Sequence, residues 1–541
     1  MNIEPDFIPY PSRRYPIYAR EGMVATSSPQ ASAAGIEALR QGGNAIDAAI
    51  AAAATLTVTE PCSNGIGGDA FAIISTGGKL YGLNASGKAP LNISIGKLKG
   101  SLGNIEKMPH SGWAPTMVPG APKAWARLAE RFGKLPLKTS MKGAIHYARE
   151  GYPLGATKAQ YFTQAAERYA NTASFEGDKK IFDEWFKTFM PWENAPKACD
   201  LLVLENHANS LQAIADTNAE AFYNGELTER IIADSNELGG YFNKEDFSSY
   251  DTEWVDPVSI NYHGYDVWEI PPNGQGVAAL AALNILNNFE FASRENPDSF
   301  HRQWEAMKLA YSDVRAHVTD LSFMKEDYRE WLSPEYGKKR AGEIGERACL
   351  PGPINPPKGG TVYLATADAE GNMVSYIQSN YMGFGSGIVI RGTGISLQNR
   401  GSDFSLNPFA ANALAPGKKC YHTIIPGFLT KDGKALGPFG VMGAYMQPQG
   451  HLQLITNMID FGLNPQQALD APRWQWIEGR EIHIEPSFNP EIACALVKRG
   501  HDVRVSLQTA NFGRGQCIIR LDNGVLVGAT ESRVDGNIAC I

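Results

Sequence analysis

The sequence predicts an α+β protein that folds as an αββα four-layer sandwich. Ala-rich or amphipathic stretches at 29–61, 273–289 and 301–320 are predicted to be helical. Paired apolar runs around Gly-containing turns predict antiparallel hairpins, as at 70–87 and 256–272. Helix pairs that flank antiparallel hairpins are typical of two stacked sheets with helices covering both outer faces.

The first helical region is predicted to be a pair of helices followed by a hairpin. Gly42 and Gly43 interrupt an Ala-rich run, and Asn44 is a plausible N-cap for the second helix. Residues 125–250 are predicted to be mostly helical, with a charged, Trp-rich insertion at 175–200.

The last third of the chain is predicted to be richer in strands. Residues 340–360 are expected to form a loop that ends in "CLPGPINPPKGG". Strands are then predicted at 361–368 and 372–379 around the turn "AEGN", with further strand structure at 386–400.

Composition limits the classes of partner. The 541-residue chain is 43% hydrophobic and 20% charged, with a net charge of −8 and no long basic run. Two domains are the default expectation for this length. Nucleic acids and anionic membrane surfaces bind clustered Lys and Arg, so neither is expected as a partner.

The N-terminus and the cysteines predict a cytoplasmic protein. The first residues have acids before bases and no apolar signal-peptide core. Seven cysteines without a CxxC pair indicate reduced thiols. The most apolar stretch, 45–59, is too short to span a membrane and carries Asp47, so a buried helix is expected there.

Searches for familiar catalytic motifs exclude several chemistries. The ten histidines are dispersed, with no HExxH and no close Cys/His set, so neither a metal nor an organic cofactor is predicted. No serine lies in GxSxG. "GFGSG" (383–387) lacks the last Gly of GxGxxG, because Ile388 stands there, and it lies between predicted strands.

Thr361 is the candidate nucleophile. A Thr hydroxyl needs an adjacent base, and a cut between Gly360 and Thr361 would supply the new α-amine, whose pKa is about 7.7–8.0. The same hydroxyl can make that cut by attacking the Gly360 carbonyl in an N→O acyl shift. The alternative is an ordinary Thr that opens a β-strand, which is common.

Four segments resemble the γ-glutamyltransferases, also called glutathione hydrolases, in family order. They are "GMVATSSPQASAAGIEALRQGGNAIDAAIAAAATLTVTEPCSNGIGGDAF" (22–71), "WEAMKLAYSDV" (304–314), the segment 360–405 and "NMIDFGLNPQQALDAPR" (457–473). The resemblance covers nearly the whole chain. It implies the αββα sandwich of the N-terminal nucleophile hydrolase type, in which a precursor cleaves itself and exposes a terminal nucleophile.

The resemblance places the family's nucleophile on Thr361. Cleavage after Gly360 would then give a large region, 1–360, and a small region, 361–541, which together form one catalytic unit. The two cleaved chains would remain partners as a heterodimer, and further dimerisation is left open.

At several other family positions, the residue in this chain could perform the role that the resemblance implies. The hydroxyl that bonds to the nucleophile falls on Ser379. The oxyanion-binding pair falls on Gly443 and Ala444, where backbone amides do the work, so Ala is tolerable. The Asp that meets the substrate's α-amine is retained as Asp403.

The substrate pocket departs from the family pattern. The Arg that clamps the substrate's α-carboxylate is replaced by Ser86 in "LNASGKAP". The other candidate substrate-binding positions with altered residues are Arg400, Tyr381, His422 and Thr423. The segment after Phe404 is also short, which implies that the lid loop of some members is missing.

Two substrate classes remain open. Arg400 or Lys88 could take over the carboxylate, so that the enzyme still acts on γ-glutamyl compounds such as glutathione. Otherwise the pocket suits another carboxylate-bearing amide, such as oxamate or a glutaryl (cephalosporin-type) side chain. Arg400 could instead form a structural salt bridge with Asp403, and His422 could be an ordinary hydrogen-bonded histidine.

The sequence therefore predicts a self-processing γ-glutamyltransferase-like amidohydrolase or acyltransferase. Its partners would be a small-molecule amide and an acceptor, either water or an amine. A non-catalytic relative that binds an amino-acid-like ligand is the alternative from another class. Hydroxyls at both Thr361 and Ser379 argue against that alternative.

Overall fold

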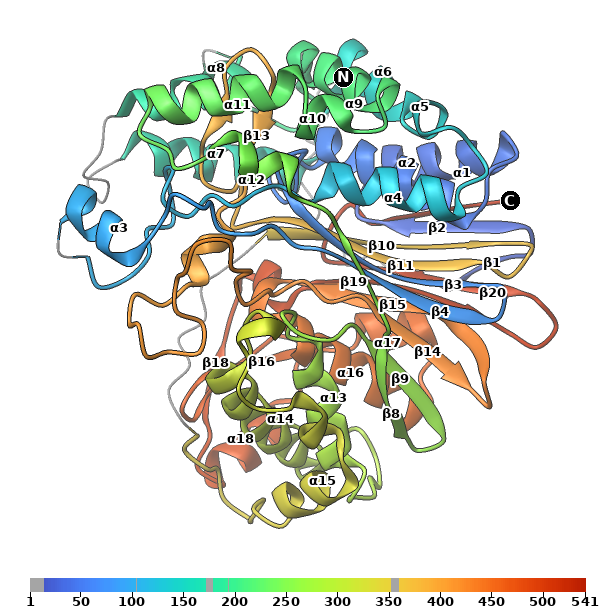
Figure 1. Cartoon of the computed structure of the whole chain (residues 1–541). Helices are drawn as coiled ribbons and strands as arrows, with labels where there is room; N and C mark the ends of the chain where they lie inside the picture. Colours follow the sequence, from blue (N-terminus) through green and yellow to red (C-terminus); the bar gives the residue numbers. More distant parts are fainter. Residues whose placement is uncertain (1–13, 104, 172–178, 193, 352–359) are drawn as a thin grey trace.

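The protein forms four layers in the computed structural model, which describes residues 14–103, 105–171, 179–192, 194–351 and 360–541 (Figure 1). Two seven-stranded sheets are stacked in the middle of this described part, and helices cover the outer face of each. The predicted αββα sandwich is therefore confirmed. Residues 352–359 of the predicted loop, and 172–178 and 193 in and beside the Trp-rich insertion, lie outside the described residues.

The first sheet interleaves strands from both sides of residue 360. Its spatial order is β21 (Asn537–Cys540), β2 (Gly22–Thr26), β10 (Gly360–Asp368), β11 (Met373–Tyr381), β3 (Asp69–Thr76), β4 (Lys79–Ala85) and β7 (Glu253–Val255). The hairpin β10–β11 thus lies at the centre, with β2 on one side and β3 on the other. The predicted hairpins at 70–87 and around "AEGN" are both present.

The second sheet packs against the first. Its spatial order is β1 (Ile17–Ala19), β20 (Leu526–Thr530), β19 (Arg514–Arg520), β15 (Lys434–Met442), β14 (Gly427–Lys431), β9 (Tyr265–Glu269) and β8 (Val258–Tyr262). An apolar core fills the space between the sheets and includes Phe71, Tyr363, Ile377, Phe428 and Ile518. Side chains alternate across β10, so Tyr363 faces this core while Val362 and Leu364 face the helices.

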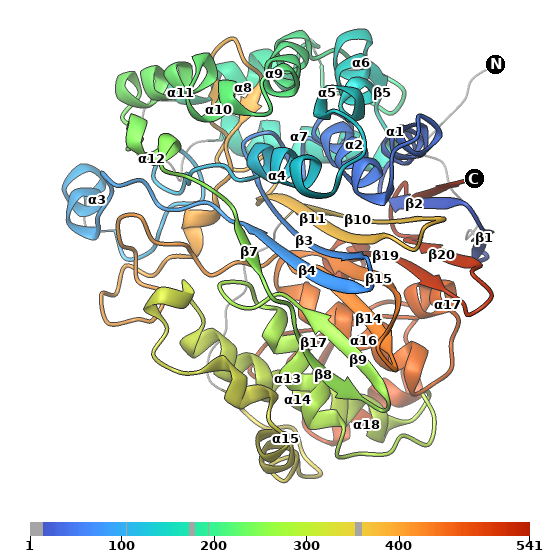
Figure 2. The ribbon, with the colours of Figure 1, turned by 45° about the vertical axis from the view of Figure 1, so that its right-hand side comes forward.

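One helical layer covers the first sheet (Figure 2). It contains α1 (Pro29–Arg40), α2 (Ala45–Thr59), α4 (Ala121–Phe132), α5 (Leu137–Ser140), α6 (Lys142–Glu150) and α9 (Glu205–Asp216). Asn44 caps α2 as predicted, because its side chain accepts hydrogen bonds from the amides of Ile46 and Asp47. Every residue of α2 is buried, which explains its Ala-rich, mostly apolar composition.

Further helices extend this layer over the end of the sandwich. They are α3 (Ile95–Leu102), α7 (Ala156–Ala170), α8 (Asp183–Phe189), α10 (Glu220–Tyr223), α11 (Glu226–Glu237) and α12 (Lys244–Ser248). Two short antiparallel pairs lie beside them: β5 (Tyr152–Pro153) with β6 (Leu201–Leu202), and the hairpin of β12 (Val389–Ile390) with β13 (Ile395–Ser396). The region 386–400 therefore contains less strand than predicted.

The other helical layer covers the second sheet. It contains α13 (Gly276–Leu286), α14 (Pro297–His317), α15 (Pro334–Ala341), α16 (Gln447–Ile459), α17 (Pro465–Asp470) and α18 (Pro490–Lys498). A small sheet of β16 (Trp474–Glu478), β17 (Glu481–Ile484) and β18 (Asp502–Val505) packs at its edge. The predicted helices at 273–289 and 301–320 correspond to α13 and α14.

The cysteines and the lengths of the helices bear on two further expectations. All seven cysteines are free thiols. Among the described residues, every helix is too short or too polar to cross a bilayer.

Candidate active site

Thr361 lies at the start of β10, where the regular pairing with β11 is interrupted. Gly360 pairs with Tyr381 and Val362 pairs with Gln378, so a bulge places Thr361 outside the regular register. The Thr361 side chain meets Ser379, with the two hydroxyl oxygens 3.1 Å apart. Thr361 is only 1% exposed.

Two hydroxyls converge on the carbonyl that precedes Thr361. The Oγ1 of Thr361 and the Oγ of Ser379 each donate a hydrogen bond to the Gly360 oxygen, both at 2.8 Å. Ser379 also accepts from the Tyr381 amide at 2.7 Å, which fixes its orientation. Two O–H donors on one carbonyl polarise it and favour negative charge on its oxygen.

The predicted oxyanion turn ends β15. Gly443 has φ 138° and Ala444 has φ 51°, so both residues lie in the region that favours glycine. A Cβ at Gly443 would come within 3.0 Å of the Gly513 Cα, which explains why glycine stands there. Met442, directly before the turn, and Gly360 line the same cavity.

The Arg400 side chain is buried beside the predicted substrate residues. Its guanidinium lies 3.8 Å from the centre of the Tyr381 ring, and its Nη1 donates to the Thr423 Oγ1 at 2.8 Å. Among the described residues, neither its Nε nor its Nη2 has a hydrogen-bond partner, although Arg400 is only 1% exposed. Buried donors of this kind normally have a protein, water or ligand partner, so these two nitrogens are free to bind a further group.

Asp403 completes this cluster. Its Oδ1 accepts a hydrogen bond from the Tyr445 hydroxyl at 2.8 Å, whereas its Oδ2 is buried without a partner in the described part of the chain. The shortest approach of Arg400 to that Oδ2 is 3.9 Å, too long for a hydrogen bond. Arg400 and Asp403 therefore form a long ion pair, as the salt-bridge alternative expects, but without a hydrogen bond, so both groups keep unused hydrogen-bonding capacity.

His422 belongs to a buried hydrogen-bond network near Arg400. The Ile424 amide donates to its Nδ1 at 3.3 Å, so Nε2 carries the proton and donates to the Asp69 Oδ2 at 3.0 Å. Burial, followed by the charge of Arg400, holds the pKa of His422 well below its usual value. Both ring nitrogens therefore form hydrogen bonds within the protein, which favours the alternative of an ordinary hydrogen-bonded histidine.

Asp69 was missed by the sequence analysis. Its Oδ1 accepts from the Gly87 amide, the Gly120 amide and Gln398. Burial raises the pKa of Asp69 to about 7, although Arg400 and these donors act in the opposite direction. Asp69 therefore connects the segments that contain Gly87, Gly120 and Gln398 through hydrogen bonds.

Gln275 is a second residue that the sequence analysis missed. Its Nε2 donates to the carbonyl oxygens of Thr423 and Ala444, at 2.7 and 2.8 Å. Gln275 therefore connects the predicted substrate pocket to the oxyanion turn. Only its place in "PPNGQG", directly before α13, could have suggested such a role.

Ser86 and Lys88 flank Gly87, whose amide donates to Asp69. Ser86 exchanges hydrogen bonds with the Asn273 side chain, which also donates to the Cys420 carbonyl. Lys88 is half-buried, and its ammonium makes no hydrogen bond or ion pair with the described residues. Their predicted substrate contacts, like those of Tyr381 and Thr423, stay predictions.

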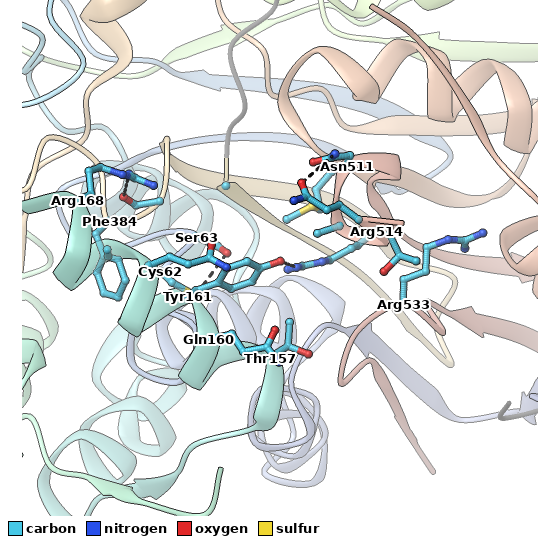
Figure 3. Close-up of a pocket in the computed structure, with 18 of the residues that line it drawn as sticks. Cys62, Ser63, Thr157, Gln160, Tyr161, Arg168, Phe384, Asn511, Arg514 and Arg533 are labelled. Atoms are coloured by element: carbon cyan, nitrogen blue, oxygen red, sulfur yellow. Dashed lines mark hydrogen bonds between the residues drawn. The ribbon is translucent and has the colours of Figure 1, made fainter. Parts of the chain in front are cut away.

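An open cavity of about 670 Å³ adjoins Gly360 (Figure 3). Residues of α7, namely Thr157, Gln160, Tyr161 and Arg168, form one wall. Arg514, Arg533 and Asn511 lie across from them. Cys62 and Ser63 lie between the two walls, and the volume is typical of small-molecule sites.

A separate buried cluster has potential metal ligands, although no metal was predicted from the sequence. Donor atoms of His301, Glu305 and His501 lie within 4.8 Å of one another. His301 Nε2 donates to the Gly345 carbonyl at 2.8 Å, so its Nδ1 accepts from His501 Nε2 at 2.9 Å. The remaining nitrogen of His501 faces the Lys308 ammonium at 3.5 Å.

Lys308 fills the remaining space in this cluster. Its ammonium donates to Glu305 Oε1 at 2.7 Å, and the other carboxylate oxygen accepts from the Cys349 amide at 3.0 Å. Every ring nitrogen, the ammonium and both carboxylate oxygens thus have a partner. A cation already occupies the position where a metal ion would be attracted.

The fold and the hydroxyl pair at the start of β10 define an enzyme of the N-terminal nucleophile hydrolase type. The sequence matches the family described as gamma-glutamyltranspeptidase over residues 31–541, and the chain belongs to that family.

Known relatives extend over nearly the whole chain. It is 35% identical to a glutathione hydrolase-like YwrD proenzyme of Bacillus subtilis, over 95% of this chain and 97% of the relative. It is 31% identical to an oxamate amidohydrolase proenzyme of Klebsiella pneumoniae, over 96% of this chain and 98% of the relative. The crystal structure of a cephalosporin acylase from Bacillus halodurans aligns with a TM-score of 0.95 and 53% identity, over 100% of this chain and 99% of that one.

Proposed function

We propose that this chain is a proenzyme that cuts itself between Gly360 and Thr361 and then acts as a Thr-dependent amidohydrolase. The observation that carries the proposal is the pair of hydroxyls, Thr361 and Ser379, on the Gly360 carbonyl. The proenzyme names of the relatives support processing into two chains, 1–360 and 361–541, that stay together as a heterodimer.

The cut follows from the groups at the bond. The Thr361 oxygen attacks the Gly360 carbonyl carbon, and the peptide C–N bond breaks to leave an ester and a free amine at Thr361. Water then hydrolyses the ester and releases residues 1–360 with a terminal carboxylate. The negative charge that develops on the Gly360 oxygen is stabilised by the Ser379 hydroxyl.

Substrate turnover repeats the same chemistry. The Thr361 α-amine, with a pKa of about 7.7–8.0 for a free amine, takes the hydroxyl proton. The hydroxyl oxygen attacks the substrate carbonyl carbon, the C–N bond breaks, and the amine leaves with the proton that the α-amine had taken. The acyl group stays on Thr361 as an ester until water or an acceptor amine releases it. The Gly443 and Ala444 amides would hold the oxyanion.

The acyl half of the substrate is proposed to carry a carboxylate. The unpartnered Nε and Nη2 of Arg400 would bind it as a fork, in place of the family Arg that Ser86 replaces. Glutaryl (cephalosporin-type) side chains, oxamate and γ-glutamyl groups all carry such a carboxylate. The cephalosporin acylase and oxamate amidohydrolase names support the first two.

The γ-glutamyl class has one specific observation in its favour. Asp403 Oδ2 is buried without a partner in the described structure, and an α-ammonium would satisfy it. A glutaryl amide lacks that ammonium. Both classes use Arg400, so only Asp403 distinguishes them.

Self-cleavage is tested by the intact mass of freshly purified protein under denaturing conditions. The wild-type chain should give two species, one of which begins at Thr361. Thr361→Ala should give one uncut, inactive chain, whereas Thr361→Ser should still be cut because it keeps a hydroxyl. Two normally processed chains from Thr361→Ala would refute the proposal, and a single stable wild-type chain would favour the non-catalytic alternative.

The acyl group is tested with matched anilides. A γ-glutamyl anilide and a glutaryl anilide differ only in the α-ammonium, so their kcat/KM ratio measures the contribution of Asp403. If Asp403 binds the ammonium, the γ-glutamyl compound should be preferred about tenfold or more. Asp403→Asn should then remove the preference. A preference for the glutaryl compound would assign the enzyme to the acylase-like class.

A further inference from the structure

Tyr445 connects two parts of the proposed active site. Along the chain it directly follows Ala444 of the predicted oxyanion turn. Its buried side chain reaches the proposed acyl pocket, where the hydroxyl donates a hydrogen bond to the Asp403 Oδ1 at 2.8 Å. The position of this one residue therefore affects both the turn and the orientation of the Asp403 carboxylate.

Helix α14 contacts Tyr445 at two points. The Tyr311 hydroxyl donates a hydrogen bond to the Tyr445 carbonyl oxygen at 2.6 Å. The Arg315 guanidinium lies over the Tyr445 ring, 4.6 Å from its centre. Residues four positions apart lie on the same face of a helix, so α14 presents both contacts to Tyr445 from one side.

Arg315 also contacts a second ring that is connected to the same turn. The rings of Tyr421 and Tyr445 are stacked, with centres 6.0 Å apart and planes at 13°, and Arg315 lies 4.5 Å from the centre of the Tyr421 ring. The Tyr421 hydroxyl donates to the Gln275 Oε1 at 3.0 Å, and the Gln275 amide donates to the Ala444 carbonyl. A guanidinium is attracted to the faces of aromatic rings, so Arg315 holds the two tyrosines together.

We propose that Arg315 is a positioning residue, which fixes the oxyanion turn relative to Asp403 by holding the rings of Tyr421 and Tyr445. This inference rests on the proposed function, because it concerns the same active site. Arg315 acts through the two tyrosines and not through contact with the substrate. Self-cleavage does not depend on it, since two other hydroxyls polarise the carbonyl at the cut.

Arg315→Met removes the charge and keeps a long side chain. On the γ-glutamyl or glutaryl anilide that the enzyme accepts, the self-cleaved variant should have a kcat/KM about tenfold below that of the wild type. The loss should appear mainly in kcat, because the oxyanion turn acts on the transition state. Arg315→Lys keeps a cation over the rings and should recover most of the loss.

Arg302→Met is the matched control on the same helix. The Arg302 guanidinium lies 4.8 Å from the centre of the Phe289 ring, so this variant removes the same kind of contact. At 1.5 Å per residue, Arg302 lies about 20 Å from Arg315 along α14. The control should cut itself and keep the wild-type kcat and KM.

A double-mutant cycle tests the route through Tyr445. Tyr445→Phe removes the hydroxyl that orients Asp403 but keeps the ring. If Arg315 acts through Tyr445, the combined variant Arg315→Met/Tyr445→Phe should lose less kcat/KM than the product of the two single losses.

The outcomes separate this inference from the proposed function. Wild-type kcat/KM in Arg315→Met, an equal loss in Arg302→Met, or multiplicative losses in the cycle would overturn the inference and leave the proposed function standing. Arg315→Gln gives the same comparison if Arg315→Met does not fold. A wild-type chain that cuts itself but turns over neither anilide would count against the proposed function, and against this inference with it.

Discussion

Two buried clusters of charged side chains differ in how completely their hydrogen bonds are made. Around Arg400, two guanidinium nitrogens and one oxygen of Asp403 have no partner in the described structure. Around Lys308, by contrast, hydrogen bonds are made by all the polar groups: the ammonium, the Glu305 carboxylate and the His501 ring nitrogens.

The difference supports the proposed ligand site around Arg400 and a structural role for the Lys308 cluster. A buried unpaired polar group costs about 1–3 kcal/mol, and more if it is charged, so the Arg400 cluster lowers stability unless something binds there. In the Lys308 cluster, each of these polar groups has a hydrogen-bond partner. Substitutions in the first cluster should therefore affect activity, and substitutions in the second should affect stability.

The largest effect is expected for Lys308→Met. It leaves Glu305 as an unpaired carboxylate in the interior, which should lower the free energy of unfolding by about 3–5 kcal/mol. Urea and thermal midpoints followed by circular dichroism measure this. The double variant with Glu305→Gln should recover part of the loss, because no buried charge remains. Unchanged midpoints in the single variant would contradict the structural role of this cluster.

Arg400→Met should have the next largest effect, on activity. Loss of the charged fork should reduce kcat/KM about 100-fold, or about 3 kcal/mol, for the carboxylate-bearing amide that the enzyme accepts. The thermal midpoint should change less than in Lys308→Met, because the loss of two unpaired donors offsets the loss of the charge that faces Asp403. A large fall in stability with little change in kcat/KM would place Arg400 in the structural class instead.

The smallest effect concerns the pH dependence of stability. Burial, followed by the charge of Lys308, lowers the pKa of His501 to about 2 from 6.5. The unfolded chain therefore binds an additional proton below pH 6.5, and stability should fall by about 1.4 kcal/mol for each pH unit below that value.

His501→Gln removes this titrating group. The variant should be less stable than the wild type at pH 7.5, but its stability should decline less steeply between pH 6.5 and 5.5. Urea midpoints across that range give both slopes. The raised pKa of Asp69 acts in the opposite direction, but equally in both proteins, so it cancels in the comparison. Equal slopes would show that His501 does not titrate as inferred.

The sequence predicted the parts of the fold that depend on local patterns. The cap at Asn44 and the hairpins at 70–87 and around "AEGN" follow from side-chain chemistry within a few residues, and all are present. The short strands at 386–400 were overestimated. Four residues, 391–394, separate β12 from β13, and tertiary packing decides how far such a hairpin extends.

The candidate site was only partly accessible from the sequence. Thr361 and Ser379 could be named from the family resemblance, and the structure brings them together. Asp69 and Gln275 could not, because each acts on residues far along the chain, such as Gln398 and Ala444. A single sequence carries no signal for contacts that the fold alone creates.

The strand order of the first sheet has a consequence for a chain cut after Gly360. β10 is flanked by β2 on one side, β11 is flanked by β3 on the other, and β21 closes the sheet beyond β2. Each fragment therefore supplies the neighbours that complete the other's backbone hydrogen bonds. The two pieces should migrate together in gel filtration, separate only under denaturing conditions, and fail to exchange with fragments from other molecules, so that self-cleavage creates a new chain end without creating a dissociable assembly.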